Sequence, residues 1–202
     1  MAGGLGLLVT DASPLITLAV ADALNCLTLP ELRVVIPDMI YFEVTQDIVR
    51  AGAEDIVGWA RNHRNLVEIA PTTVFAEFQA LRSIDARTRS RGRGELSALE
   101  ILRDETDADE SLEAILLYED ADIRSRRFKG AMPERVAAVS TGDFLRALEK
   151  AGLIQSADHV LDAAAAKGRN IDSQRRADPE SEGNLLVAEH LARRSVGRTP
   201  PR

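Results

Sequence analysis

Five short apolar runs recur along the chain with helix-like segments between them, and this pattern constrains the fold more than any other feature. The runs lie at residues 7–10, 33–36, 66–69, 114–118 and 136–139. Strands that are buried on both faces have short apolar sequences of this kind, and strands that alternate with helices pair in parallel. The pattern therefore predicts an α/β fold in which helices cover both faces of a central parallel sheet.

Caps and prolines mark the helices between these runs. Ser13-Pro14 predicts a helix that begins with Ser13 as its N-cap and continues until just before Pro30. Pro37-Asp38 predicts a second helix. Its buried stripe would comprise Ile40, Val44 and Ile48. Further helices are predicted at residues 74–84, 95–104, 141–150, 157–167 and 185–194.

A chain of 202 residues has the length of one main domain. Between residues 170 and 184 the sequence turns polar, and we expect this segment to loop away before a last amphipathic helix. The predicted division is a main domain at 1–172, followed at 173–202 by the polar loop, the short helix and a flexible tail. That helix could cover the core of its own domain or dock on a partner, and self-packing is the favoured alternative.

The composition excludes several classes of protein. A formal net charge of −7 argues against a protein that coats nucleic acid by bulk electrostatics. Three dispersed histidines and the single Cys26 offer neither zinc-ligand spacing nor a nucleophile-histidine pair. The apolar stretch 15–29 contains Asp22 and Asn25 and is too short to cross a bilayer, and no signal peptide precedes it. We therefore expect a cytoplasmic protein without a membrane contact.

Acidic side chains follow two of the predicted strands. Asp11 comes directly after the first strand, and Glu119 and Asp120 come after the fourth. Ligands of open parallel sheets bind outside the carboxyl ends of the strands, so these acids should share one edge. Glu95, at the start of a predicted helix, and Glu43, beside the apolar stripe of another, could lean toward the same edge.

Taken singly, each of these acids has an ordinary structural explanation, as a helix-terminal or solvated surface residue. Taken together, carboxylates that converge on one site repel one another and are costly to keep ionised without a cation. Hard oxygen ligands suit Mg²⁺ or Mn²⁺. Such a site supports hydrolysis of phosphodiester bonds by a metal-activated water, without a side-chain nucleophile.

Five stretches carry a family resemblance when they are taken in order. They are TDASPLITLA at 10–19, VIPDMIYFEV at 35–44, GRGELSALEIL at 92–102, LLYEDADIRSRR at 116–127 and VSTGDFLRALEKAGLI at 139–154. With these motifs the chain resembles PIN-domain proteins and is similar to the VapC toxin ribonucleases over residues 7–172. The resemblance implies a three-layer α/β/α fold with a central parallel sheet of about five strands, and an acidic pocket that holds Mg²⁺ or Mn²⁺.

The resemblance also assigns roles to residues. The acidic positions of the family fall on Asp11, Glu43, Glu95 and the pair Glu119-Asp120, all expected to be catalytic. Of these, Asp11, Glu95, Glu119 and Asp120 would be the metal ligands. Ser13 matches a small hydroxyl residue that steadies the pocket. The subgroup usually has Asp-Asp where this chain has Glu119-Asp120, so either Glu119 reaches the metal or Asp120 replaces it, with Asp122 as an outside candidate.

Two basic clusters flank the acidic motifs, one at 82–93 and one at 124–129. The residues expected to contact RNA phosphates are Arg91, Arg93, Arg124 and Arg126. The resemblance implies an endoribonuclease of the toxin type, restrained by an antitoxin and acting as a possible homodimer. The alternative is a catalytically silent PIN-like protein that binds RNA or a protein partner. Its support is Glu119 and an acidic insertion, residues 104–110, that would lengthen a loop beside the pocket.

A third class, a receiver domain or an aspartate-based phosphatase, fits the sequence poorly. The phosphatase requires Asp-x-Asp after its first strand, where this chain has Asp11-Ala12-Ser13. A receiver requires an acidic pair near the end of its first strand and a late lysine at the sheet edge. The ribonuclease hypothesis is therefore favoured.

Overall fold

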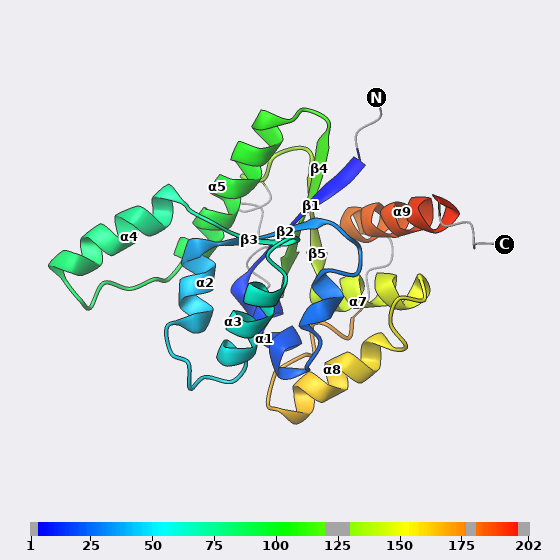
Figure 1. Cartoon of the computed structure of the whole chain (residues 1–202), viewed down its shortest axis with the longest axis horizontal. Coiled ribbons are helices and arrows are strands. Elements are labelled where there is room, and N and C mark those ends of the chain that lie inside the picture. The colour runs from blue at the N-terminus through cyan, green and yellow to red at the C-terminus, as the bar shows by residue number, and fades with distance from the viewer. Residues whose placement is uncertain (1–3, 120–129, 177–180, 198–202) are drawn as a thin grey trace.

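The computed structural model describes residues 4–119, 130–176 and 181–197, with side chains up to 194 (Figure 1). Its centre is one five-stranded sheet in the order β3-β2-β1-β4-β5. Every neighbouring pair of strands is parallel. The strands are β1 (Gly4–Thr10), β2 (Arg33–Pro37), β3 (Val67–Ala70), β4 (Leu112–Tyr118) and β5 (Val136–Ser140). The predicted central parallel sheet of five strands is confirmed.

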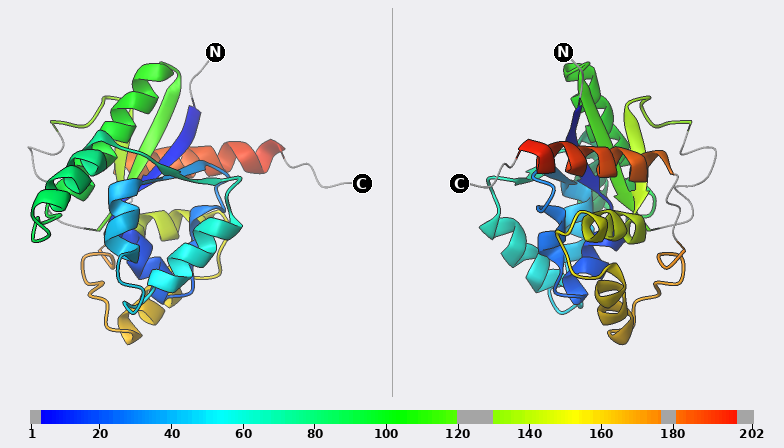
Figure 2. Two further views of the ribbon diagram at one scale, coloured as in Figure 1. Left: turned by 60° about the vertical axis from the view of Figure 1, so that its left-hand side comes forward. Right: turned by 90° about the vertical axis from the view of Figure 1, so that its right-hand side faces the viewer.

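Helices form a layer on each side of this sheet. Seen from two further directions, α5 (Arg93–Ala108) and α9 (Glu182–Gly197) lie on opposite faces (Figure 2). The other α-helices are α1 (Ala12–Val20), α2 (Asp38–Thr45), α3 (Ala53–Asn62), α4 (Thr73–Ile84), α7 (Thr141–Lys150) and α8 (Ala157–Ala166). The structure is therefore the three-layer α/β/α sandwich that the sequence predicts.

The core is built around the two central strands, β1 and β4. Leu7, Leu8 and Val9 are consecutive and each is fully buried, so both faces of β1 are covered. Ile115 and Leu116 of β4 are buried to the same extent. A strand that is covered on both faces gains stability from every side chain, which explains why these runs are apolar throughout.

The first helix differs from its prediction at both ends. It begins at Ala12 with Asp11 as its N-cap residue, so Pro14 lies in the first turn, where its missing N–H costs nothing. It ends at Val20, because Asp22 adopts the left-handed conformation at φ 56° and the Ala23 N–H bonds back to the Leu18 carbonyl at 2.8 Å. Residues 24–27 then form a separate 3₁₀ turn.

The second helix is shorter than predicted, since α2 ends at Thr45. Ile48 lies beyond it and is 53% exposed, so it does not extend the buried stripe of Ile40 and Val44. The helix α3 follows and was not predicted. Its buried residues Ile56 and Trp59 lie three positions apart on one face, among polar neighbours.

The acidic residues 104–110 do not lengthen a loop beside the site. Residues 104–108 instead form the last turn of α5, which runs from the carboxyl edge of the sheet to the amino edge where β4 begins. Glu105 pairs with Arg33, the first residue of β2, and Arg135 contacts the Thr106 carbonyl. These contacts place the acidic segment at the opposite edge of the sheet from the predicted site.

The segment after α8 packs against the domain rather than looping away from it. Ile171 is 3% exposed and Gln174 is 1% exposed. Gly142 leaves room for this segment, because a Cβ at that position would lie 2.0 Å from the Gln174 carbonyl oxygen. Helix α9 then packs on the sheet through the buried Val187 and Leu191, so its apolar face covers the protein's own core.

Among the described helices, none combines the length and the apolar composition that a bilayer crossing requires.

Candidate functional site

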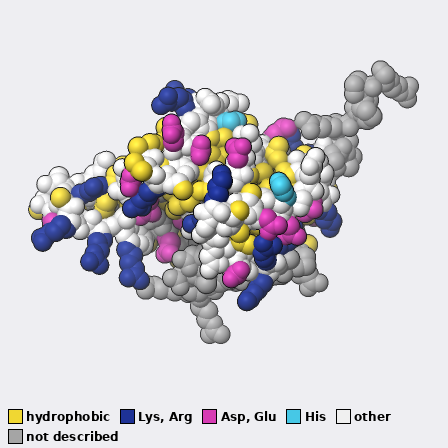
Figure 3. Space-filling model, turned by 90° about the horizontal axis from the view of Figure 1, so that it is seen from below, with side chains coloured by type: hydrophobic (Ala, Val, Ile, Leu, Met, Phe, Trp, Pro, Cys, Tyr) yellow, Lys and Arg dark blue, Asp and Glu magenta, His cyan; other side chains and the backbone are white. Residues whose placement is uncertain are grey.

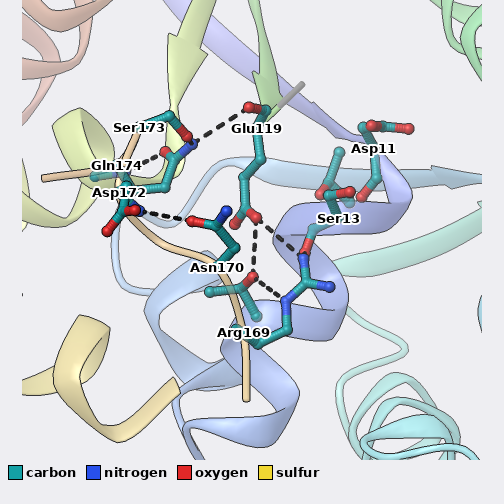
Figure 4. Close-up of polar contacts among 11 residues, drawn as sticks. Asp11, Ser13, Glu119, Arg169, Asn170, Asp172, Ser173 and Gln174 are labelled. Atoms are coloured by element: carbon teal, nitrogen blue, oxygen red, sulfur yellow. Dashed lines mark hydrogen bonds and ion pairs between the residues drawn. The ribbon is translucent and has the colours of Figure 1, made fainter. Parts of the chain in front are cut away.

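The carboxyl ends of the two central strands bring Asp11 and Glu119 to the same edge of the sheet (Figure 4). Asp11 follows β1, and its backbone N–H donates to the Leu117 carbonyl of β4 at 3.0 Å, which continues the pairing of the two strands by one bond. Although Asp11 is the N-cap residue of α1, its side chain forms no capping hydrogen bond with that helix. Capping of α1 therefore does not explain why this position has a carboxylate.

Glu43 and Glu95 form a second acidic element. Glu43 lies on α2 and Glu95 in the first turn of α5, and both side chains are half-buried. Burial raises the pKa of Glu43 above its usual range, a hydrogen bond with the Ser90 side chain lowers it, and Coulomb repulsion from Glu95 raises it again. Among the described residues, no cation contributes to this balance. The structure thus confines two like charges that a bound cation would stabilise.

Gly92 and Gly94 explain how this pair forms. Gly92 is the N-cap residue of α5 and has φ 74°, a left-handed conformation that glycine adopts without strain. Gly94 is buried in the first turn, where a Cβ would come within 3.0 Å of the Glu43 Oε2 atom. The absence of a side chain at Gly94 therefore lets α5 approach the carboxylate of Glu43.

Glu119 is directed toward Arg169 instead of toward Asp11 (Figure 4). Its Oε2 atom accepts from Thr17 Oγ1 at 2.9 Å and from Arg169 Nη2 at 3.1 Å. Arg169 in turn donates to Thr17 Oγ1 at 2.9 Å and to the Ser13 carbonyl at 3.2 Å. The Glu119 side chain is only 7% exposed, so its charge is balanced within the protein by the guanidinium group.

The segment after α8 completes this arrangement. Gln174 Nε2 donates to the Glu119 backbone carbonyl at 3.3 Å, and Gln174 Oε1 accepts from the Gly142 N–H at 3.1 Å. The Glu119 Oε1 atom is buried and forms no hydrogen bond with any described residue. Beside it lies a pocket of about 560 Å³, whose lining includes Ser13, Asn170, Ser173 and Arg176. The predicted site did not include Thr17, Arg169 and Gln174, because no local signal marks a residue that contacts the site from 50 or more positions away.

Within residues 4–119, 130–176 and 181–197, no three or more His, Cys, Asp and Glu side chains lie close enough together to hold a metal ion. The structure brings Glu43 close to Glu95, and it places Asp11 and Glu119 at one edge with their side chains apart. Ser13 lies beside Asp11 and contributes its backbone carbonyl to Arg169. Four residues of the prediction, Asp120, Asp122, Arg124 and Arg126, lie outside the described residues.

Two other acids near the site have structural roles. Asp38 accepts from the Thr72 N–H at 3.1 Å and from the Thr72 hydroxyl at 2.6 Å. Glu100 accepts from the Thr73 N–H at 2.6 Å and from the Val74 N–H at 3.1 Å, at the N-terminus of α4. These carboxylates fix α4 in place.

Basic side chains lie in the last turn of α4 and in the loop that follows it. Lys and Arg side chains are spaced along this projecting end of the molecule (Figure 3). Arg91 lies in the loop, and Arg93 begins α5 with its Cζ atom 5.6 Å from the centre of the Phe78 ring. The Arg82 Cζ atom lies 5.1 Å from the centre of the Phe42 ring. A cationic surface thus adjoins the Glu43-Glu95 pair.

The donor set suits a hard divalent cation. Asp11, Glu43 and Glu95 contribute carboxylate oxygens, which a hard divalent cation prefers, and burial raises the pKa of Glu43. These features define an α/β/α protein with acidic side chains at the carboxyl edge of its parallel sheet, where proteins of this architecture bind their ligands.

A comparison with family models agrees with this class. The chain matches the PIN-domain model over residues 7–178, and it therefore belongs to the PIN-domain family. PIN domains are generally nucleases that use divalent metal ions such as Mg²⁺. Searches of curated proteins and of solved structures gave no match.

Proposed function

We propose that this protein is a divalent-metal-dependent endoribonuclease, whose acidic edge binds Mg²⁺ or Mn²⁺ and hydrolyses phosphodiester bonds of RNA. The observation that carries the proposal is the half-buried pair of Glu43 and Glu95 in a PIN domain, where burial in the first place and repulsion from Glu95 in addition raise the pKa of Glu43. A protein gains nothing in stability from two adjacent acids without a cation, so a functional requirement explains the arrangement.

The metal ligands in this proposal come from four parts of the chain. Asp11 after β1, Glu43 on α2 and Glu95 on α5 would provide three carboxylates, and Asp120 would provide the fourth. The three described carboxylates do not lie close enough together to hold an ion by themselves, so they would have to approach one another when the ion binds. A bound metal ion would lower the pKa of a water molecule and balance charge on the scissile phosphate. The protein's own residues position these carboxylates. Gly94 lets α5 approach Glu43, and the bond between Asp11 and Leu117 fixes the end of β1 beside β4.

The sequence predicts Glu119 as a metal ligand, but in this proposal it has a positioning role. Its carboxylate already pairs with Arg169 and accepts a hydrogen bond from Thr17, and moving it away from Arg169 would leave a partly buried guanidinium group without its anion. We therefore assign metal binding at the end of β4 to Asp120 and a positioning role to Glu119. The Glu-Asp sequence then retains the acid that the site needs.

The experiment is cleavage of a labelled single-stranded RNA with Mn²⁺ or Mg²⁺. We expect cleavage that EDTA abolishes and that Asp11→Asn and Asp120→Asn each reduce by at least about a hundredfold, as the loss of a charged group at a catalytic site does. Glu119→Gln, which preserves the contacts to Arg169 and Thr17, should retain most of the activity. Cleavage that persists in Asp11→Asn would contradict the proposed site.

The sequence motifs further support a toxin ribonuclease similar to VapC, which an antitoxin protein would restrain. A homodimer would join two acidic edges into one longer groove for RNA. A small open reading frame for a DNA-binding protein directly upstream of the gene would support the toxin assignment. Growth arrest on expression, relieved by co-expression of that protein, would test it.

The alternative is a catalytically silent PIN-domain protein that binds RNA or a protein partner. One observation favours it: the described residues contain no group of three acids placed to hold a metal. Calorimetric titration with Mn²⁺ separates the two functions. The ribonuclease requires binding that Asp11→Asn abolishes, whereas the silent protein would bind no Mn²⁺ at this edge.

A further inference from the structure

A second pocket is lined by residues of α2, of α4 and of the loop before α5. Its volume is about 350 Å³, and its lining includes Phe42, Phe78, Arg82, Arg89, Ser90 and Arg91. We call it the arginine pocket. Of the described residues that line it, none is acidic. Its volume is near the lower limit of ligand pockets, which suits one small ligand rather than a long one.

The arginines of this pocket are available to a ligand. Within the described residues, Arg82, Arg89 and Arg91 form no ion pair, unlike the neighbouring Arg87, which pairs with Asp85 at 3.1 Å. A cluster of guanidinium groups without carboxylate partners repels itself, and an anion relieves that repulsion. The pocket therefore favours a ligand with negative charge.

The arginine pocket also contains aromatic rings, of which Phe42 is half-buried and Phe78 is 2% exposed, so Phe42 provides the accessible flat surface. The Phe42 and Phe78 ring centres lie 5.6 Å apart, and Phe75 packs against both of them. The Arg82 Cζ atom lies 5.1 Å from the centre of the Phe42 ring and 5.9 Å from that of Phe78. Aromatic rings and guanidinium planes are the surfaces on which unpaired bases stack. A ligand that is both anionic and planar fits this lining better than a simple anion does.

The pocket is joined to the acidic site through two of its residues. Phe42 directly precedes Glu43 in α2, and the Ser90 side chain forms the hydrogen bond that lowers the pKa of Glu43. A nucleotide bound there would thus lie beside the carboxylates. We infer that the arginine pocket binds one unpaired nucleotide of the RNA next to the scissile bond, with its base on Phe42 and Arg82 and its phosphates on Arg89 and Arg91.

This inference rests on the proposed ribonuclease function for its ligand, but it is tested by binding alone. The probe is a fluorescent twelve-nucleotide oligouridine in EDTA, where no cleavage occurs, and anisotropy is measured over a range of salt concentrations. The test variant is Arg82→Ala with Arg91→Ala. The charge-matched control is Arg61→Ala with Arg64→Ala, since both are exposed and lie just before β3, at the opposite edge of the sheet.

The expected result is a weaker affinity for the test variant and a nearly unchanged affinity for the control. The slope of log K against log salt should also fall by about 0.7 for each phosphate that the test variant no longer neutralises. Phe42→Leu should weaken binding about tenfold, whereas Phe42→Trp, which keeps a ring, should retain it. An oligonucleotide with abasic sites has no base to stack on Phe42. Its affinity for the native protein should therefore equal the affinity of the oligouridine for Phe42→Leu.

Three results would overturn the inference. One is equal loss of affinity in the test and control variants, which would mean bulk electrostatics. Another is equal affinity for an RNA duplex of the same length, whose bases cannot enter the pocket. The third is full displacement of the oligouridine by an equimolar acidic peptide, which would identify a protein partner as the occupant. Failure of the Mn²⁺ cleavage assay with binding intact would instead count against the ribonuclease alone.

Discussion

Gly94 lies against the carboxylate of Glu43, so that a Cβ on the glycine would meet the Glu43 Oε2 atom at 3.0 Å and the Ile40 Cγ1 atom at 3.4 Å. The first distance is shorter than ordinary van der Waals contact, and the second lies at its lower limit. The glycine of the Gly-Glu motif therefore does more than start a helix. It sets how closely Glu95, the next residue, approaches Glu43.

Gly94→Ala should separate activity from stability. Alanine favours a helix by about 1 kcal/mol over glycine, so the variant should unfold at an equal or higher temperature. The added methyl group must displace the Glu43 carboxylate, so RNA cleavage should fall by at least about tenfold, as misplacement of catalytic groups does. Thermal denaturation and initial cleavage rates measure the two effects.

The matched control for this variant is Gly58→Ala in α3, where a Cβ would meet nothing within 4 Å. It should gain the same helix propensity and leave cleavage unchanged. If Gly94→Ala cleaves RNA as fast as the native protein, the contact with Glu43 does not control the site.

Glu43 should make stability depend on pH in a defined direction. Its pKa is raised from an ordinary value of 4.5 by burial and by Glu95. The native state therefore binds more protons than the unfolded state between pH 4.5 and the raised value, and stability falls as pH rises through that window. Glu43→Gln should remove this loss, so that in EDTA at neutral pH the variant is more stable than the native protein.

Urea denaturation in EDTA at several pH values from about 4 to 8 measures this effect. Glu77→Gln, at an exposed position of α4, should follow the native curve throughout. A Glu43→Gln curve with the same pH dependence as the native protein would show that Glu43 does not carry the expected penalty.

Much of the fold was accessible from the sequence because its signals are local. The runs at 7–10 and 114–118 are apolar because β1 and β4 are covered on both faces, and that requirement is visible without a structure. The end of α1 at Val20 could not be predicted from the sequence in this way. Asp22 in a left-handed conformation divides what the spacing of Leu18 and Leu24 presents as one helix.

The candidate site was accessible only in part, for the same reason. Strand order alone brings Asp11 and Glu119 to one edge, so their neighbourhood could be predicted. The direction of the Glu119 side chain could not be predicted, because it depends on Arg169, which lies 50 positions further along the chain. Arg169 directly precedes the polar segment at 170–184, whose sequence resembles an exposed loop. Its buried residue Gln174 has no apolar pattern to indicate its position.

Arg169→Met should destabilise the protein by about 3 kcal/mol, because it leaves the buried Glu119 carboxylate without its cation. The value is at the low end for buried pairs, since the Arg169 side chain is 27% exposed. The double variant Arg169→Met with Glu119→Leu should recover most of this loss, because the unpaired charge is gone. Urea denaturation of the four proteins forms a double-mutant cycle. Additive single effects would show that the two side chains are not coupled.

Asp11→Asn should lose the stabilisation that Mn²⁺ gives the native protein. A ligand at about a hundred times its Kd stabilises the native state by about 2.7 kcal/mol, which for a domain of this size raises Tm by about 5–10 °C. Asparagine keeps the shape of aspartate, so the variant should fold, and its Tm should be the same with Mn²⁺ and with EDTA. Asp107→Asn, an exposed position near the end of α5 at the opposite edge of the sheet, should respond to Mn²⁺ as the native protein does. If Mn²⁺ raises the Tm of Asp11→Asn by as much as it raises the Tm of the native protein, the ion binds elsewhere, because the variant no longer has the Asp11 carboxylate as a ligand.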